Sequence, residues 1–113
     1  MTSEKCGLMC VFRPDKLKST EEMRELFMGS YPRFLDMETL EFKCWWCNQK
    51  DKEWGALYIF KSKEALDNYV KSDIWQNIVP EKYGCVPEWK IVEPGPILSK
   101  RKIIEADKSW IAG

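Results

Sequence analysis

Two neighbouring runs of apolar and aromatic residues, 40–48 and 54–60, constrain the fold more than any other feature of the chain. Residues 49–53 between them are polar and of hairpin length, so the two runs predict a β-hairpin. Side chains alternate between the faces of a strand, which places Phe42, Cys44 and Trp46 on one face and Trp45 and Cys47 on the other. The second run likewise sets Ala56, Tyr58 and Phe60 against Leu57 and Ile59. Neither face is polar, as a solvated face would be, so both faces of the hairpin require burial.

The segment before the hairpin predicts a strand followed by a helix. Residues 6–12 form a short apolar run that stops at the turn-forming sequence 13–15, which is typical of a strand and its end. Ser19 and Glu22 have the spacing of a capping box and therefore predict the start of a helix. Pro32 leaves the far end of that helix open.

The segment after the hairpin predicts a second helix and a last strand. Ser62 can cap a helix whose apolar face carries Ala65, Leu66, Tyr69 and Val70. A short helical continuation is expected to end at Pro80, and residues 85–92 read as a strand. The resulting βαββαβ order predicts an α+β, ferredoxin-like fold, in which a four-stranded antiparallel sheet carries its helices on one face.

Helices on one face leave the second apolar face of the hairpin without a cover inside the subunit. We therefore expect a homodimer in which two sheets pack face to face, as in a dimeric α/β barrel. The alternative is that the end of the chain folds over the sheet. The 113 residues make one domain, which we place at residues 1–96, followed by a C-terminal tail at 97–113 that could pack on the dimer.

Composition excludes several functions. The chain has no histidine, so it cannot supply a Ser–His–Asp triad, a histidine haem ligand or a mixed Cys/His zinc site. Its 18 basic residues balance its 18 acidic ones, so no net field attracts nucleic acid or a membrane surface. The chain begins without the apolar stretch of a secretory signal, and its strongest apolar run is too short to span a bilayer. With five cysteines, an odd number, this predicts a protein of the reducing cytoplasm, away from the membrane.

Two motifs resemble known sites and are better explained otherwise. Cys44 and Cys47 have the spacing of a metal or redox pair, but in a strand this offset places them on opposite faces, so we predict no metal.

The βαββαβ order is also that of RNA-recognition modules. Those proteins stack bases on aromatic residues of the third strand next to a leading basic residue. Here Glu53 is acidic and Gly55 stands at an aromatic position, so we predict no nucleic-acid partner.

The remaining candidates for chemistry are aromatic side chains and one lysine. The simplest explanation for the aromatic residues is that they fill the core and the dimer interface. Lys43 lies between Phe42 and Cys44 and shares a strand face with Trp45. Its stem could extend along the apolar surface to reach water. Alternatively, its cation could help to bind an anionic or phenolic substrate.

The sequence resembles a known family from the hairpin onward. Phe42-Lys43-Cys44-Trp45, the run at 53–60, the helix at 62–70 and Val92-Glu93-Pro94 carry the resemblance, which covers roughly residues 40–99. They resemble the YdhR-type monooxygenases of the dimeric α/β-barrel superfamily, which also contains antibiotic-biosynthesis monooxygenases. The resemblance implies a barrel formed by two sheets and a pocket for a small aromatic or hydrophobic ligand. It also implies oxidation by dioxygen without a cofactor, where electrons come from the substrate's own enolate or phenolate.

The resemblance also suggests which residues form the site. Tyr58 and Lys43 are the expected catalytic residues, with Lys43 favouring the anionic form of the substrate. The expected substrate-binding residues are Trp45, Tyr69, Trp75 and Tyr31. The absence of histidine argues against the haem-degrading and polyketide-cyclase branches of the superfamily, which use a histidine iron ligand and typically a histidine base. Two other functions stay open: a non-catalytic small-molecule-binding or stress-type barrel dimer, and a lyase or isomerase on the same scaffold.

Overall fold

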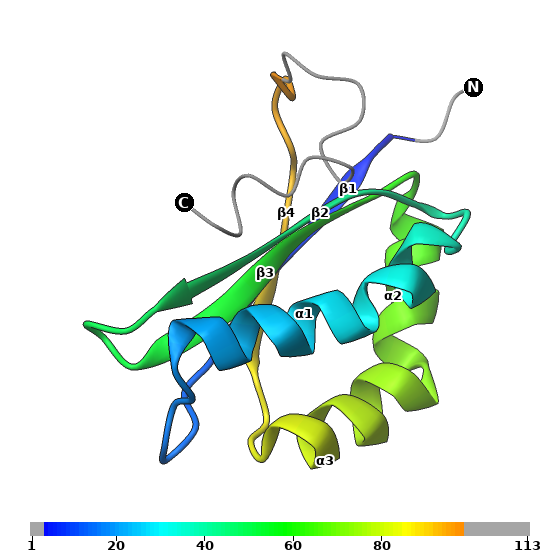
Figure 1. Ribbon diagram of the computed structural model, residues 1–113. Helices are drawn as coiled ribbons and strands as arrows, with labels where there is room; N and C mark the ends of the chain where they lie inside the picture. Colours follow the sequence, from blue (N-terminus) through cyan, green and yellow to red (C-terminus); the bar gives the residue numbers. More distant parts are fainter. Residues whose placement is uncertain (1–3, 99–113) are drawn as a thin grey trace.

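The computed structural model describes residues 4–98, so residues 99–113 of the predicted tail lie outside the described part. The elements follow the predicted βαββαβ order, with short helical additions before the last strand (Figure 1). In chain order they are β1 (Cys6–Phe12), α1 (Thr20–Leu35), β2 (Leu40–Asn48), β3 (Glu53–Phe60), α2 (Lys63–Lys71), η1 (Ile74–Ile78), α3 (Val79–Tyr83) and β4 (Glu88–Val92).

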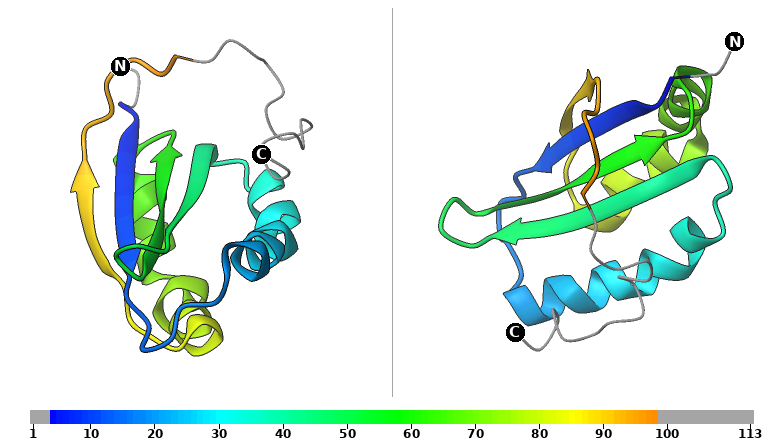
Figure 2. Two further views of the ribbon diagram at one scale, coloured as in Figure 1. Left: turned by 60° about the vertical axis from the view of Figure 1, so that its left-hand side comes forward. Right: turned by 90° about the horizontal axis from the view of Figure 1, so that it is seen from above.

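The four strands form one antiparallel sheet in the order β2-β3-β1-β4. This order and the helices on one side of the sheet confirm the ferredoxin-like α+β fold. In the view from above in Figure 2, the strands lie in front of α3. β1 and β3 occupy the centre of the sheet, while β2 and β4 form its edges.

The helix starts follow the sequence signals. The Ser19 side chain accepts a hydrogen bond from the backbone N–H of Glu22, and the Glu22 carboxylate accepts one from the backbone of Ser19. Ser62 caps α2 by accepting a hydrogen bond from the backbone N–H of Ala65. α1 continues through Pro32 to Leu35. The first helix therefore passes the proline that had left its end open.

The region around Pro80 corrects two expectations. The helical continuation does not end at Pro80, because this proline lies in the first turn of α3, where its missing N–H is not needed. α3 ends instead at Gly84, which adopts the left-handed conformation with φ 75°. The last strand begins at Glu88 rather than at residue 85, directly after Pro87, which has no N–H to donate to a ladder.

The helix-side face of the sheet forms the core. Leu8, Cys10 and Phe12 from β1 and Trp54, Ala56, Tyr58 and Phe60 from β3 are all buried there. On the open face, Ile59 is buried whereas Leu57, Phe42 and Trp46 are half-buried. Met9 on the same face is exposed. The hairpin therefore has the two apolar faces that its sequence predicts, and the helices cover one of them.

Candidate functional site

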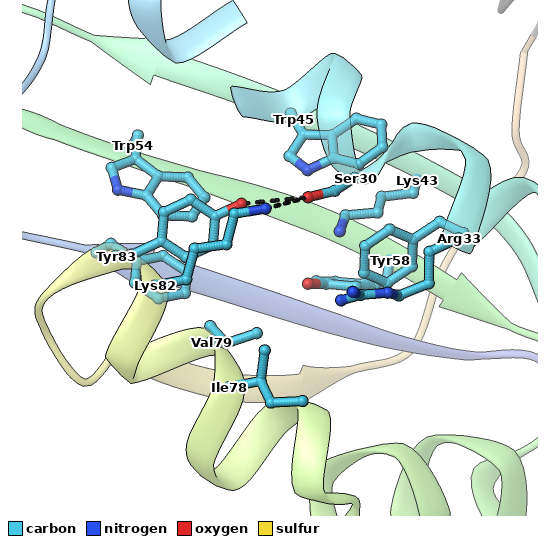
Figure 3. A pocket seen from close by; sticks show the side chains of 12 residues that line it. Ser30, Arg33, Lys43, Trp45, Trp54, Tyr58, Ile78, Val79, Lys82 and Tyr83 are labelled. Carbon is cyan, nitrogen blue, oxygen red and sulfur yellow. Dashed lines mark hydrogen bonds between the residues drawn. The ribbon is translucent and has the colours of Figure 1, made fainter. Parts of the chain in front are cut away.

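A small hollow lies between the helix side of the sheet and the helices α1 and α3 (Figure 3). Its lining residues come from β1, α1, β2, β3 and the η1–α3 segment: Phe12, Ser30, Arg33, Phe34, Lys43, Trp45, Trp54, Tyr58, Ile78, Val79, Lys82 and Tyr83. Three of these are basic and none is acidic. The hollow therefore combines aromatic walls with an unbalanced positive charge.

The Lys43 amine is at the aromatic wall of this hollow. Cross-strand pairing places Lys43 opposite Tyr58, both on the helix side of the sheet. The Nζ atom lies 3.3 Å from the ring centre of Phe34, 4.2 Å from that of Tyr58 and 4.3 Å from that of Trp45. Within residues 4–98, no acidic side chain or hydrogen-bond acceptor pairs with this nitrogen. Aromatic faces are thus its partners.

Burial shifts the titration of the Lys43 amine toward its neutral form, against the attraction of the three ring faces for the charged form. Removal from water lowers the pKa of Lys43 well below its ordinary value of 10.5, because burial penalises the charged form. The electrostatic interaction of Lys43 with Cys10 raises its pKa and so opposes this change. The positive charges of Arg33 and Lys82 lower the pKa of Lys43 further. A lysine with a depressed pKa can act as a base or as a nucleophile near neutral pH.

A second polar group of the hollow joins α1 to α3. Lys82 Nζ donates a hydrogen bond to Ser30 Oγ at 3.1 Å, and Ser30 Oγ lies 3.4 Å from the Tyr83 hydroxyl (Figure 3). Arg33 lies one helical turn after Ser30 and also lines the hollow. Neither Lys82 nor Arg33 forms an ion pair with any residue of the described part. These groups can therefore offer charged hydrogen-bond donors to an anion.

Tyr58 and Tyr69 form a buried pair behind the hollow. Their hydroxyl oxygens lie 3.3 Å apart, and their ring centres are 5.3 Å apart. Burial raises the pKa of Tyr58 well above its ordinary value, and the nearby Tyr69 adds to this rise. Burial also raises the pKa of Tyr69. Both phenols are therefore protonated at neutral pH and can donate hydrogen bonds.

The structure brings together some of the predicted site residues and separates others. Lys43, Trp45 and Tyr58 line the hollow. The Tyr69 hydroxyl contacts that of Tyr58. The ring centres of Trp75 and Tyr69 are 5.5 Å apart in the same core cluster. The ring centres of Tyr31 and Trp45 are 6.1 Å apart, and Tyr31 does not line the hollow. The last three residues thus support the walls of the hollow, while their role in binding a substrate stays a prediction.

Sequence reasoning missed the polar side of the hollow. Ser30, Arg33, Lys82 and Tyr83 come from two helices that the fold brings together. Arg33 and Lys82 each occupy the last turn of a helix, where basic residues are common because they complement the helix dipole. Their sequence signal was therefore that of an ordinary helix end.

The free space in the hollow is small. The centre of a water molecule can reach about 20 Å³ of it, which is room for one or two waters. An aromatic ring can enter only if side chains at the mouth move, and Ile78 there is exposed. In residues 4–98, no three His, Cys, Asp or Glu side chains gather as metal ligands.

Comparisons with known proteins show what shares this fold. No family model matches the sequence, and no curated protein matches it. A protein of unknown function from Nitrosomonas europaea has a similar structure: the TM-score is 0.66, the identity is 10%, and the match covers 89% of this chain and 99% of that one. For a conserved protein from Methanosarcina mazei the TM-score is 0.60, the identity is 16%, and the coverage is 81% and 94%.

A third similar structure belongs to a protein with a described activity. SnoaB, a cofactor-independent oxygenase from Streptomyces nogalater, matches with a TM-score of 0.59 and 10% identity over 87% of this chain and 100% of its own. The chain therefore shares its ferredoxin-like α+β fold with this oxygenase. Across residues 4–98, none of the helices combines the length and apolar character needed to cross a membrane.

Proposed function

We propose that this protein is a cofactor-independent monooxygenase that acts on a small aromatic or enolisable substrate in the hollow beside Lys43. The observation that carries this proposal is the position of the Lys43 amine, which lies among Phe34, Trp45 and Tyr58 with no acidic partner in the described part of the chain. Such a wall suits a flat, electron-rich ring, and the basic groups suit the anion that dioxygen oxidises.

The proposed reaction starts with a proton transfer. The neutral Lys43 amine accepts a proton from a phenol or enol, which leaves an ammonium next to the new phenolate or enolate. The new anion compensates the ammonium charge of Lys43, for which the described part of the chain offers no acidic partner. The Tyr58 hydroxyl, protonated at neutral pH, can donate a hydrogen bond to the same anion.

Oxygen is consumed in the second stage. The anion transfers electrons to dioxygen, one oxygen atom enters the product as a carbonyl, and the other leaves as water with two hydrogens from the substrate. The substrate supplies all four electrons that reduce dioxygen, so the balance needs neither a metal nor a flavin. In this scheme the protein binds the ring, takes the proton and stabilises the anion.

Oxygen uptake with a panel of hydroquinones and enolisable phenols tests the proposal. We expect wild-type protein to consume oxygen, and Lys43→Met and Tyr58→Phe to lose at least about a hundredfold in rate, the smallest effect typical of a lost acid–base group. Lys50→Met is the matched control, because Lys50 lies on the exposed hairpin turn. Absence of uptake with every compound, together with tight binding of one of them, would support a non-catalytic binding protein instead.

That second candidate has its own support. The hollow has room for only one or two waters, so side chains fill most of the space in which a catalytic pocket would lie, which argues against turnover. A binding protein with this fold would use the same aromatic wall and basic groups without turnover. Ligand-induced quenching of tryptophan fluorescence, measured together with oxygen uptake, separates the two functions.

The assembly in the proposal is a homodimer that joins two open sheet faces. Its support is the apolar character of that face, where Met9, Phe42, Trp46 and Leu57 retain exposed surface. The proposal places the folded domain at residues 1–96 and gives the tail at 97–113 a position on the dimer. A cytoplasmic location completes it, supported by five cysteines that are all free.

A further inference from the structure

Three basic side chains converge on one small hollow without an acidic neighbour. Lys43 reaches it from β2, Arg33 from α1 and Lys82 from α3 (Figure 3). No lining residue is acidic, and none of the three forms an ion pair within residues 4–98. Like charges gathered at a partly enclosed site repel one another, so the arrangement is favourable mainly when an anion is bound.

The three groups are not equivalent, and the difference suggests a division of roles. Arg33 and Lys82 are exposed at the helix ends, where water reaches their side chains. Lys43 is half-buried, and its amine contacts three aromatic rings instead of water or an acid. The outer pair is therefore suited to bind a carboxylate, and the inner amine is suited to react.

We propose that Lys43 forms a reversible imine with a small 2-keto acid whose carboxylate is bound by Arg33 and Lys82. This activity goes beyond the proposed oxygenation, because it uses the Lys43 amine as a nucleophile and requires no dioxygen. The Lys82–Ser30–Tyr83 hydrogen bonds position the carboxylate-binding groups, since Ser30 Oγ fixes Lys82 Nζ at 3.1 Å.

The reaction balances without another reagent. The lone pair of Lys43 Nζ attacks the carbonyl carbon, and the carbonyl π electrons move to oxygen. A proton moves from nitrogen to that oxygen to give a carbinolamine. The nitrogen lone pair then forms the C=N bond as the hydroxyl leaves with a second proton as water. Amine and ketone thus give imine and water, with no change in oxidation state.

The structure supplies the two conditions that this step needs. The amine must be unprotonated, and both its removal from water and the nearby positive charges lower the pKa of Lys43. The departing hydroxyl must receive a proton, and Tyr58, which Lys43 faces across the strand pair, carries a protonated phenol. Side chains at the mouth must move less to admit a three-carbon acid than to admit a fused ring system.

Reductive trapping tests the imine. Wild-type protein is incubated with pyruvate and sodium cyanoborohydride at neutral pH, and intact mass followed by peptide mapping locates the reduced adduct. We expect a single adduct on Lys43 that forms well before any label at exposed lysines such as Lys50. Lys43→Arg, which keeps the positive charge but cannot form the imine, should lose the adduct, while Lys50→Met should keep it. Labelling that is equal at Lys43 and at exposed lysines would overturn the proposal.

A matched ligand tests the carboxylate site. Methyl pyruvate has no charge and a more electrophilic ketone, so the rate of each compound at Lys43 is divided by its rate at the exposed Lys50. This ratio should be about tenfold higher for pyruvate, as expected for charge-assisted hydrogen bonds. Arg33→Met and Lys82→Met should lower the ratio for pyruvate more than that for methyl pyruvate, which falls only because both charges lower the pKa of Lys43. Equal ratios for the two compounds in the wild type would overturn the carboxylate assignment.

Oxygen uptake, measured in parallel, keeps the two proposals separate. If the protein forms the adduct and consumes no oxygen with phenols, the result supports the imine and contradicts the proposed monooxygenase activity. Oxygen uptake by a protein that forms no adduct on Lys43 overturns the imine and leaves the monooxygenase standing.

Discussion

The Nζ atom of Lys43 on β2 lies 3.3 Å from the centre of the Phe34 ring on α1, and both residues line the hollow. A lysine that occupies such a site without an acidic partner carries a desolvation cost that an apolar side chain of similar length would avoid. The site therefore combines a reactive group with a local loss of stability. This relationship makes the free energy of unfolding a readout of the site.

Replacement of this lysine should stabilise the fold. We expect Lys43→Met to raise the free energy of unfolding at pH 7 by about 1 kcal/mol, because the variant removes a desolvated amine and keeps the packing of the stem. Urea denaturation monitored by tryptophan fluorescence measures the change. A lower stability than that of the wild type would show that Lys43 serves mainly to hold the fold together.

The pH dependence of the same difference has a defined sign. The pKa of Lys43 is lower in the folded than in the unfolded chain, so between these two values the unfolded chain binds more protons. The stability that Lys43 costs is therefore largest below its folded pKa, and the cost disappears as the pH rises toward 10.5. Tyr58 and Tyr69 contribute alike to both proteins, whereas the Lys43 charge lowers the pKa of Cys10, so the comparison is made with Cys10→Ala in both backgrounds. The advantage of Lys43→Met should thus shrink from pH 7 to pH 10, and a constant difference would contradict the lowered pKa.

The Tyr58–Tyr69 pair gives a second prediction. Tyr69→Phe removes one hydroxyl and leaves the buried Tyr58 hydroxyl without this partner, so we expect a loss of about 1–2 kcal/mol in the free energy of unfolding. Tyr31→Phe is the control, since Tyr31 is half-buried and its hydroxyl has no hydrogen-bond partner in the described part. Equal losses in the two variants, measured by urea denaturation, would show that the Tyr58–Tyr69 hydrogen bond contributes nothing.

Gly55 allows the close approach of Trp46 on the open sheet face. A Cβ atom built at Gly55 would lie 2.1 Å from the Cys10 carbonyl oxygen and 2.6 Å from the Trp46 ring. Since backbone and a large ring cannot both move away, Gly55→Ala should cost about 2–3 kcal/mol in thermal or urea denaturation. Gly29→Ala is the matched control: nothing lies within 4 Å of a Cβ there, and alanine in α1 should stabilise by about 0.5–1 kcal/mol.

The sequence was sufficient for most of the fold because its signals are local. The capping box at Ser19, the cap at Ser62 and the alternation along the hairpin each depend on residues close in the chain. The prediction that the helical continuation ends at Pro80 was wrong, because a proline can follow the end of one helix or occupy the first turn of the next. The position of Pro80 depends on the π-helical turn η1 before it, and no local sequence pattern predicted that turn.

The candidate site was predicted only where one strand pair forms it. The family resemblance grouped Lys43, Trp45 and Tyr58, and alternation placed Lys43 and Trp45 on one strand face; the structure pairs Lys43 with Tyr58 on the adjacent strand. Ser30 and Lys82 lie 52 positions apart, and only the packing of α1 beside α3 brings them within hydrogen-bond distance. A one-dimensional pattern holds no information on that contact, which explains why the basic side of the hollow was not found.

The open sheet face supports a prediction about assembly. Leu57 lies at the centre of this face on β3, paired with Met9 on one side and Cys44 on the other. In a dimer that buries this face, a two-fold axis would bring the two copies of Leu57 close to each other. We expect wild-type protein to sediment as a dimer, and Leu57→Lys to sediment as a folded monomer, because the variant places like charges in an apolar interface.

The control for this experiment separates the open face from exposed apolar surface in general. Val86 is 78% exposed and lies in the connection before β4, so Val86→Lys should leave the dimer intact. Circular dichroism of Leu57→Lys establishes that the monomer is folded rather than denatured. A wild-type chain that sediments as a monomer at tens of micromolar would contradict the sheet-to-sheet dimer. The apolar face would then need another cover, and the alternative of a chain end folded over the sheet would take its place.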